Sequence, residues 1–229
     1  TSDALDPARD ARVTAAFTAM PGTVTNIDGG FVRNQQAVST IAKLVLDGYA
    51  GAGSVEYGNC DYHNNPVNTT AARDFALGVL IGQTISLAAA MSRDLMVYVY
   101  SDGAVGSGTT EQAANGLAPG VNGVAKHQWN GDNGTKAAVM LLVYKKDGKP
   151  TVRNSGRQVG AYNDSGSVDR LEDKYNRIAR SDTSDNLAKA VVANYLSLVG
   201  DESKLANVVG DNPFGESLDY YVGFGKLRG

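Results

Sequence analysis

Two residues of metal-ligand type, Asp61 and His63, stand two positions apart in the stretch SVEYGNCDYHNN. They follow residues 54–57, which alternate in the manner of a short β-strand, so the pair is predicted to lie where a strand ends. A carboxylate and an imidazole in that position can hold one divalent cation, and catalytic ions are commonly held in this way. The alternative interpretation is a polar turn that binds nothing.

The elements around this pair predict a β-α-β unit. Residues 71–92 contain no proline and place their apolar side chains on one broad helical face. Residues 94–102, DLMVYVYSD, are β-branched or aromatic almost throughout, which is typical of a strand buried on both faces. Because such crossovers join parallel neighbours and are right-handed, we expect Asp61, His63 and Asp102 at one edge of the sheet.

A fourth candidate ligand, Asp132, lies in residues 103–134, a segment rich in glycine and asparagine. We interpret this segment as a functional loop because it is too long for a simple connector. The next apolar strand is predicted over residues 136–145, so Asp132 precedes a strand instead of following one. It reaches the candidate site only if the preceding loop folds back.

Helical spacing of apolar residues predicts three more helices, over residues 7–20, 33–48 and 182–199. Together with the β-α-β unit, they predict an α/β protein whose sheet is mostly parallel and flanked by helices. We interpret residues 1–229 as a single α/β domain or as the C-terminal portion of a larger one. The chain begins with Thr, without a leader, which favours a missing N-terminal part.

Composition argues against several classes of protein. The hydrophobic fraction of 42% allows a real core, and the net charge of −3 offers no basic surface to nucleic acid. No apolar run is long enough to cross a bilayer. The single cysteine, Cys60, cannot form an internal disulfide. We expect it to be a small buried residue, because on an extended backbone it points away from Asp61.

The order of the motifs resembles a known family. GNCDYH at residues 58–63 is followed by a long helix, by MVYVYSDGAVGSG at residues 96–108, and by GDNG at residues 131–134 before AAVMLLVY. This order is similar to that of an uncharacterised exported bacterial family of alkaline-phosphatase/sulfatase-like proteins. That family carries a Gly-Gly-Trp-Asp-Thr-His signature, a strand ending in Ser-Glu-Phe-Gly-Arg, and a Thr-Asp-His-Gly motif. The resemblance covers roughly residues 55–144.

The resemblance implies a metal site. Asp61 and His63 match the Asp and His of the first signature, while Asp102 takes the place of the Glu in the second. Asp132 matches the Asp of the third motif, but Asn133 stands where that motif has His. Asn is a weaker ligand than His for zinc, although its carbonyl oxygen suits calcium or magnesium. The implied cofactor is therefore a divalent metal: zinc, calcium or magnesium.

Two other departures from the family pattern bear on this site. Gly103 and Ala104 replace the Phe-Gly that follows the acidic residue of the second motif. His127 could stand in for the missing imidazole only if its loop reaches the site. In the family, the attacking Ser or Thr lies in an N-terminal half for which this chain shows no obvious equivalent, so the catalytic residues are unknown.

Two functions are compatible with these residues. One is metal-dependent hydrolysis of phosphate or sulfate esters by an exported protein, periplasmic or extracellular. The other is a catalytically inactive exported protein on the same fold with at most one structural cation. Its long polar loops would then serve self-association, or assembly with a missing N-terminal portion. The altered third motif favours the inactive protein, and the retained first motif favours the hydrolase.

Overall fold

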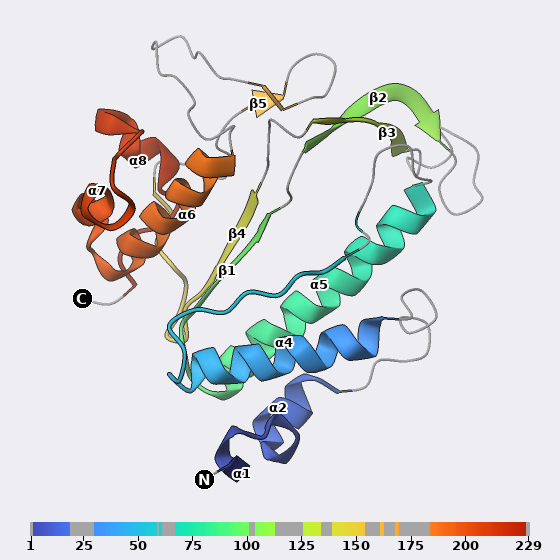
Figure 1. The fold of residues 1–229 in the computed structure, drawn as a ribbon, viewed down its shortest axis with the longest axis vertical. Coiled ribbons are helices and arrows are strands. Elements are labelled where there is room, and N and C mark those ends of the chain that lie inside the picture. Colours follow the sequence, from blue (N-terminus) through green and yellow to red (C-terminus); the bar gives the residue numbers. More distant parts are fainter. Residues whose placement is uncertain are drawn as a thin grey trace. The chain divides into compact units, whose positions relative to one another are not determined.

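The fold is described from a computed structural model (Figure 1). It describes residues 2–18, 30–58, 60, 67–100, 104–112, 126–133, 139–153, 161–162, 168–169 and 184–227. The chain divides into two compact units. One comprises Thr1–Leu95 with Tyr144–Asp147, and the other comprises Met96–Val143 with Gly148–Gly229. Each unit is described by itself.

Helices build the first unit. α4 (Phe31–Leu46) and α5 (Val67–Ala90) pack against each other, and α2 (Ala11–Ala16) packs against α5. The helices predicted over residues 33–48 and 71–92 are thus confirmed, because their apolar residues recur with the helical period. Their contact surfaces form a small core. Its buried members are Val13, Ala42, Leu46, Leu87 and Ala88.

The helix predicted over residues 7–20 is instead split into short pieces. α1 (Ser2–Leu5) and η1 (Pro7–Arg9) come before α2. The break falls at Asp10, whose backbone is extended and whose carboxylate accepts a hydrogen bond from the Arg12 N–H at 2.9 Å. An aspartate in this conformation starts a new helix by capping it, and so interrupts the one before.

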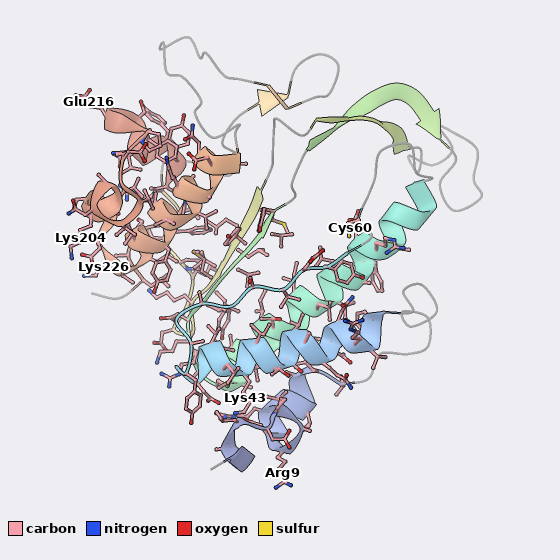
Figure 2. The ribbon with its side chains drawn as sticks, in the orientation of Figure 1. Arg9, Lys43, Cys60, Lys204, Glu216 and Lys226 are labelled. Atoms are coloured by element: carbon pink, nitrogen blue, oxygen red, sulfur yellow. The ribbon has the colours of Figure 1, made fainter. Side chains whose placement is uncertain are left out.

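Lys43 connects α2 to α4 through charge. Lys43 is labelled in Figure 2 and is only 3% exposed. Its ammonium donates hydrogen bonds to Asp10 Oδ2 at 3.0 Å and to Asp47 Oδ2. The bond to Asp47 is the main cause that raises the pKa of Lys43. Two hydrogen bonds from the Arg12 side chain also reach Asp10. These bonds to Arg12, followed by the bond to Lys43, lower the pKa of Asp10 well below its usual range, although burial opposes them.

The chain between α4 and α5 contradicts one prediction. Residues 54–57 were expected as a strand, but residues 52–58 have no regular secondary structure. They turn back along α4 after its end (Figure 1). At Gly53 the backbone lies so close to the helix that a Cβ there would be 2.2 Å from Ile41 Cγ2 and 3.2 Å from Val45 Cγ2. Glycine is therefore required at this position by close packing.

Gly53→Ala should lower the free energy of unfolding by about 1–2 kcal/mol, because the added methyl group forces Ile41 or the backbone to move. Urea unfolding followed by circular dichroism measures this loss. Gly51→Ala is the matched control, since a Cβ at Gly51 meets no atom within 4 Å. Equal losses in the two variants would show that residues 52–58 do not pack on α4 in solution.

β1 (Leu95–Tyr100) pairs with β4 (Val139–Tyr144). The amide of Lys146, just after β4, donates a hydrogen bond at 3.0 Å to the carboxylate of Asp94, just before β1. The start of β1 therefore lies beside the end of β4, as in an antiparallel pair. β1 was predicted to be buried on both faces, but Tyr98 and Tyr100 are exposed and stack on each other.

The prediction of a mostly parallel, alkaline-phosphatase-like sheet is wrong. In the part of the chain that the structure describes, each sheet has two strands, and the β2–β3 and β5–β6 pairs are antiparallel. The physical reason lies in two segments. Residues 54–57 form no strand, so β1 lacks the parallel neighbour that the crossover required. The segment over residues 103–134, interpreted as a loop, contains the paired strands β2 (Ala104–Gln112) and β3 (Lys126–Asn133).

The second unit also contains a helical cluster near the C-terminus. α6 (Ser184–Val199) confirms the helix predicted over residues 182–199, and it ends at Gly200, whose φ of +82° is a left-handed conformation that favours glycine. The remaining elements of this unit are short. They are β5 (Ala161–Tyr162), β6 (Val168–Asp169), η3 (Glu202–Lys204), α7 (Leu205–Val209), η4 (Gly215–Ser217) and α8 (Leu218–Tyr221).

Buried polar side chains of α6 hold the chain that follows α8. Asn194 is 6% exposed, donates to the Tyr221 carbonyl at 2.6 Å and accepts from the Gly223 N–H at 2.8 Å. Ser197 donates to the Phe224 carbonyl at 2.7 Å. These bonds pair side chains of α6 with backbone groups at and after the end of α8, so the polar residues take part in the core instead of weakening it.

Arg153 also binds the chain segment that follows α8. Its N–H donates to the Gly223 carbonyl at 2.9 Å, next to the β-bridge between Val152 and Phe224. Its guanidinium donates to Glu202 at 2.8 Å and to Asp219 at 2.7 Å. The hydrogen bond to Glu202 is the main cause that raises the pKa of Arg153.

Candidate functional site

The four predicted metal ligands fall unequally on the structure. Asp61, His63 and Asp102 lie outside the described residues, and Asp132 belongs to β3. Among the side chains that are described, no group of three or more His, Cys, Asp or Glu residues could share a metal ion. The positions of the predicted ligands therefore follow only from the strand register and from their places in the sequence.

The register of β2 and β3 positions Asp132. The strands are antiparallel, with Asn133 opposite Ala104 and Trp129 opposite Ser107. β3 therefore runs back along β2 and ends where β2 begins (Figure 1). Asp132 was expected to reach the candidate site only if its segment folds back, and the antiparallel register is a fold-back of this kind.

The same register relates Asp132 to Asp102. In the sequence, Asp102 precedes Ala104 by two residues, and two residues of chain span at most about 7 Å. Asp132 is the neighbour of Asn133, whose Cα is the register partner of Ala104. Asp102 lies outside the described residues, and on this register we expect it to belong to the same end of the hairpin as Asp132. The spacing and the order of the two residues in the sequence do not by themselves predict this position.

His127 lies at the opposite end of the hairpin. It is the register partner of Glu111, near the end of β2, and six residues separate it from Asn133. Six residues of extended strand cover about 20 Å. Within one chain, His127 therefore cannot replace the imidazole that the third motif lacks beside Asp132.

Asp61 and His63 precede α5, which begins at Val67, earlier than the predicted start at residue 71. Cys60 is described, and Figure 2 shows it on the chain that leads toward α5. It is partly exposed, not buried as expected, and its thiol lies 3.9 Å from the Gly58 carbonyl. The arrangement of the Asp-x-His pair itself remains a prediction.

The residues predicted as ligands are of types that bind divalent cations. Asp102 and Asp132 have carboxylate oxygens, and Asn133, which replaces the histidine of the third motif, has an amide oxygen. Such oxygens are preferred by calcium and magnesium, whereas adding the imidazole of His63 would bring zinc within range.

Sequence reasoning missed Glu111, the cross-strand partner of His127. The available signal was weak: the β-branched pair Thr109-Thr110 precedes Glu111, but Gly106 and Gly108 interrupt the strand pattern. Glycine-rich segments are usually interpreted as loops, and only the register reveals the pair.

No helix within the described ranges is both long enough and apolar enough to cross a membrane. Comparisons of the chain with protein-family models, curated proteins and solved structures found no match.

Proposed function

We propose that this protein binds a divalent cation at the end of the β2–β3 hairpin, through Asp102 and Asp132, and that the ion has a structural role. Asp61 and His63 are the further ligands that the sequence predicts. The observation that supports the proposal is the pairing of Asn133 with Ala104, because Asp132 and Asp102 are one and two residues from these partners in the sequence. The protein is proposed to act outside the cytoplasm, as the resemblance implies.

A structural role is favoured over turnover for two reasons. Hydrolysis was expected from a site at one edge of a parallel sheet, and the described strands do not form such a sheet. In addition, the chain offers no identifiable nucleophile, and Asn133 replaces the third-motif histidine. The ion would supply charge neutralisation and fix the ligand-bearing chain segments, which is how structural ions stabilise small domains.

Metal binding tests this proposal directly. We expect the purified protein to retain one divalent ion per chain after dialysis against zinc, manganese, magnesium or calcium, as measured by elemental analysis. Titration calorimetry should show at least a tenfold loss of affinity in Asp102→Asn and in Asp132→Asn, because each change removes an anionic ligand. Asp147→Asn is the matched control, since Asp147 is an exposed acid in a turn outside the hairpin.

The remaining variants define the ligand set. If Asp61→Asn and His63→Gln also weaken binding, all four predicted residues share one ion. If only the hairpin variants weaken it, the Asp-x-His pair is a polar turn. Unchanged affinity in Asp132→Asn would contradict the proposal. Cleavage of aryl phosphate or aryl sulfate esters by the metal-loaded protein would contradict the structural role and support a hydrolase.

A further inference from the structure

Residues 151–153 form a short extended segment beside the chain that follows α8. The Arg153 N–H donates a hydrogen bond to the Gly223 carbonyl at 2.9 Å. The Gly225 N–H donates to the Thr151 carbonyl, also at 2.9 Å. Two backbone bonds alone hold a segment weakly, because each replaces a bond to water, so the attachment depends on side chains as well.

The side chain of Arg153 supplies this further attachment. Its guanidinium donates to Glu202 in η3 at 2.8 Å and to Asp219 in α8 at 2.7 Å. A longer bond of 3.3 Å reaches the hydroxyl of Ser197 in α6. Val152, in contrast, is 50% exposed and buries little apolar surface. One charged side chain therefore joins residues 151–153 to η3, α6 and α8.

We propose that Arg153 holds residues 151–153 in place only while its partner carboxylates are ionised, so that acid releases this segment and leaves the helical cluster of residues 184–227 folded. The cluster has other sources of stability. They are an apolar core that includes Leu196, Phe214 and Tyr221, and hydrogen bonds of the uncharged Asn194. Segments held by different interactions open separately. The proposal is independent of the cation site, because no proposed ligand takes part.

The pH range follows from Glu202, whose side chain is 32% exposed, against 65% for Asp219. Burial is the largest single effect on Glu202 and raises its pKa, but the hydrogen bond from Arg153 leads the effects that together lower the pKa. Because the folded-state pKa is lowered, the contribution of Glu202 is present above its unfolded value of about 4.3 and is lost as pH falls through the folded value. Arg153 stays protonated over this range.

Other charged side chains lie on the elements around this segment. They are Lys204 with Asp201, Lys189 with Asp185 and Asp211, Lys226 beside Gly200, and the exposed Glu216. Within the described residues, the carboxylates that bond to Arg153 are those of Glu202 and Asp219. Glu216 lies in η4 and is labelled in Figure 2. Glu216→Gln is therefore a matched control for the loss of one negative charge in this unit.

Hydrogen exchange, measured residue by residue by NMR, tests the proposal. The N–H groups of Arg153 and Gly225 report release of the segment, because they donate its two backbone bonds. Those of Gly223 and Leu227 are internal controls, because they bond to the Asn194 side chain and to a backbone carbonyl of α6. Between about pH 6 and about pH 3, the protection factors of the first two should fall about threefold to tenfold, the range given by one partly exposed charged bond. Those of the second two should stay unchanged.

Variants assign the effect to the charges. Arg153→Met should lower the protection factor of the Gly225 N–H about tenfold already at about pH 6. Glu202→Gln with Asp219→Asn should also lower it at that pH and should show no further loss in acid. Glu216→Gln should respond to acid as the parent chain does. Circular dichroism at each pH establishes that the helices are kept.

Three results would overturn the proposal. The first is equal loss of protection at all four N–H groups in acid, which would mean that the whole cluster unfolds. The second is unchanged protection of the Arg153 and Gly225 N–H groups at about pH 3. The third is an acid response of the parent's size in the double variant Glu202→Gln with Asp219→Asn.

Discussion

Lys43→Met should lower the free energy of unfolding by about 3 kcal/mol at neutral pH. The substitution keeps a long apolar side chain but removes the ammonium that bonds to Asp10 and Asp47. The two partly buried carboxylates then keep only Arg12 as a counter-charge, at 2.7 Å from Asp10 and 3.6 Å from Asp47. The loss is large because a buried ammonium and both of its hydrogen bonds are removed. Urea unfolding followed by circular dichroism measures the loss.

The control for this experiment is Lys149→Met, at an exposed position in the turn after β4. We expect its effect to stay within about 0.5 kcal/mol, as is usual for surface substitutions. Comparable stabilities of the two variants would contradict the assignment of Lys43 as the link between α2 and α4.

The pH dependence of stability gives a second test of the same cluster. Because the folded-state pKa of Asp10 is lowered, its contribution is present above its unfolded pKa of about 3.9 and is lost as pH falls toward the folded value. Because the pKa of Lys43 is raised, its contribution is present below about 10.4 and is lost as pH rises through the folded value. Lys43→Met should therefore remove the loss of stability at the alkaline end and only reduce the loss at the acid end, because Arg12 still lowers the pKa of Asp10.

Asn194→Ala should cost a similar amount, about 3 kcal/mol. Asn194 is buried in α6 and bonds to the Tyr221 carbonyl and to the Gly223 N–H. Truncation leaves both backbone groups buried without these partners and opens a small cavity beside them. The loss should appear as a lower midpoint of thermal and urea unfolding.

Two further variants separate the causes. Asn194→Leu keeps the volume, so it should still lose most of the stability if the hydrogen bonds dominate. Asn207→Ala, at an exposed position of the short helix α7, should change the stability by less than about 0.5 kcal/mol. Full stability of Asn194→Leu would mean that the polar contacts do not hold the segment after α8.

Helices were predictable from the sequence because burial on one side imposes a period on their residues. α4, α5 and α6 each begin within about four residues of the predicted position, despite one glycine pair inside α5. The helix expected over residues 7–20 was not predictable in this way. Asp10 caps α2 at a position where the sequence pattern predicts the interior of a helix. One residue's backbone conformation decided that difference.

Strand partners were much less predictable. The apolar runs correctly predicted β1 and β4. An apolar run, however, does not predict which other strand it pairs with. The assignment of residues 54–57 as a strand supplied a false parallel partner. The hairpin β2–β3 was hidden by glycines that depress strand propensity, and its irregular register could not be derived from alternation.

The candidate site shows the same division. Residue types singled out Asp102 and Asp132, yet the argument that joined Asp102 to Asp61 and His63 depended on a parallel sheet that the described strands do not form. The proposed link between Asp102 and Asp132 is supported instead by the register of an antiparallel hairpin. The sequence supplies candidate ligands by residue type, but it does not show which distant segments pair.

Crystals grown with manganese or zinc, with anomalous scattering recorded at the metal edge, test the cation site most directly. The proposed function predicts one peak within about 2.0–2.2 Å of a carboxylate oxygen of Asp102 and of Asp132. A map with no peak at this end of the hairpin, or carboxylates too far apart to share one ion, would contradict it.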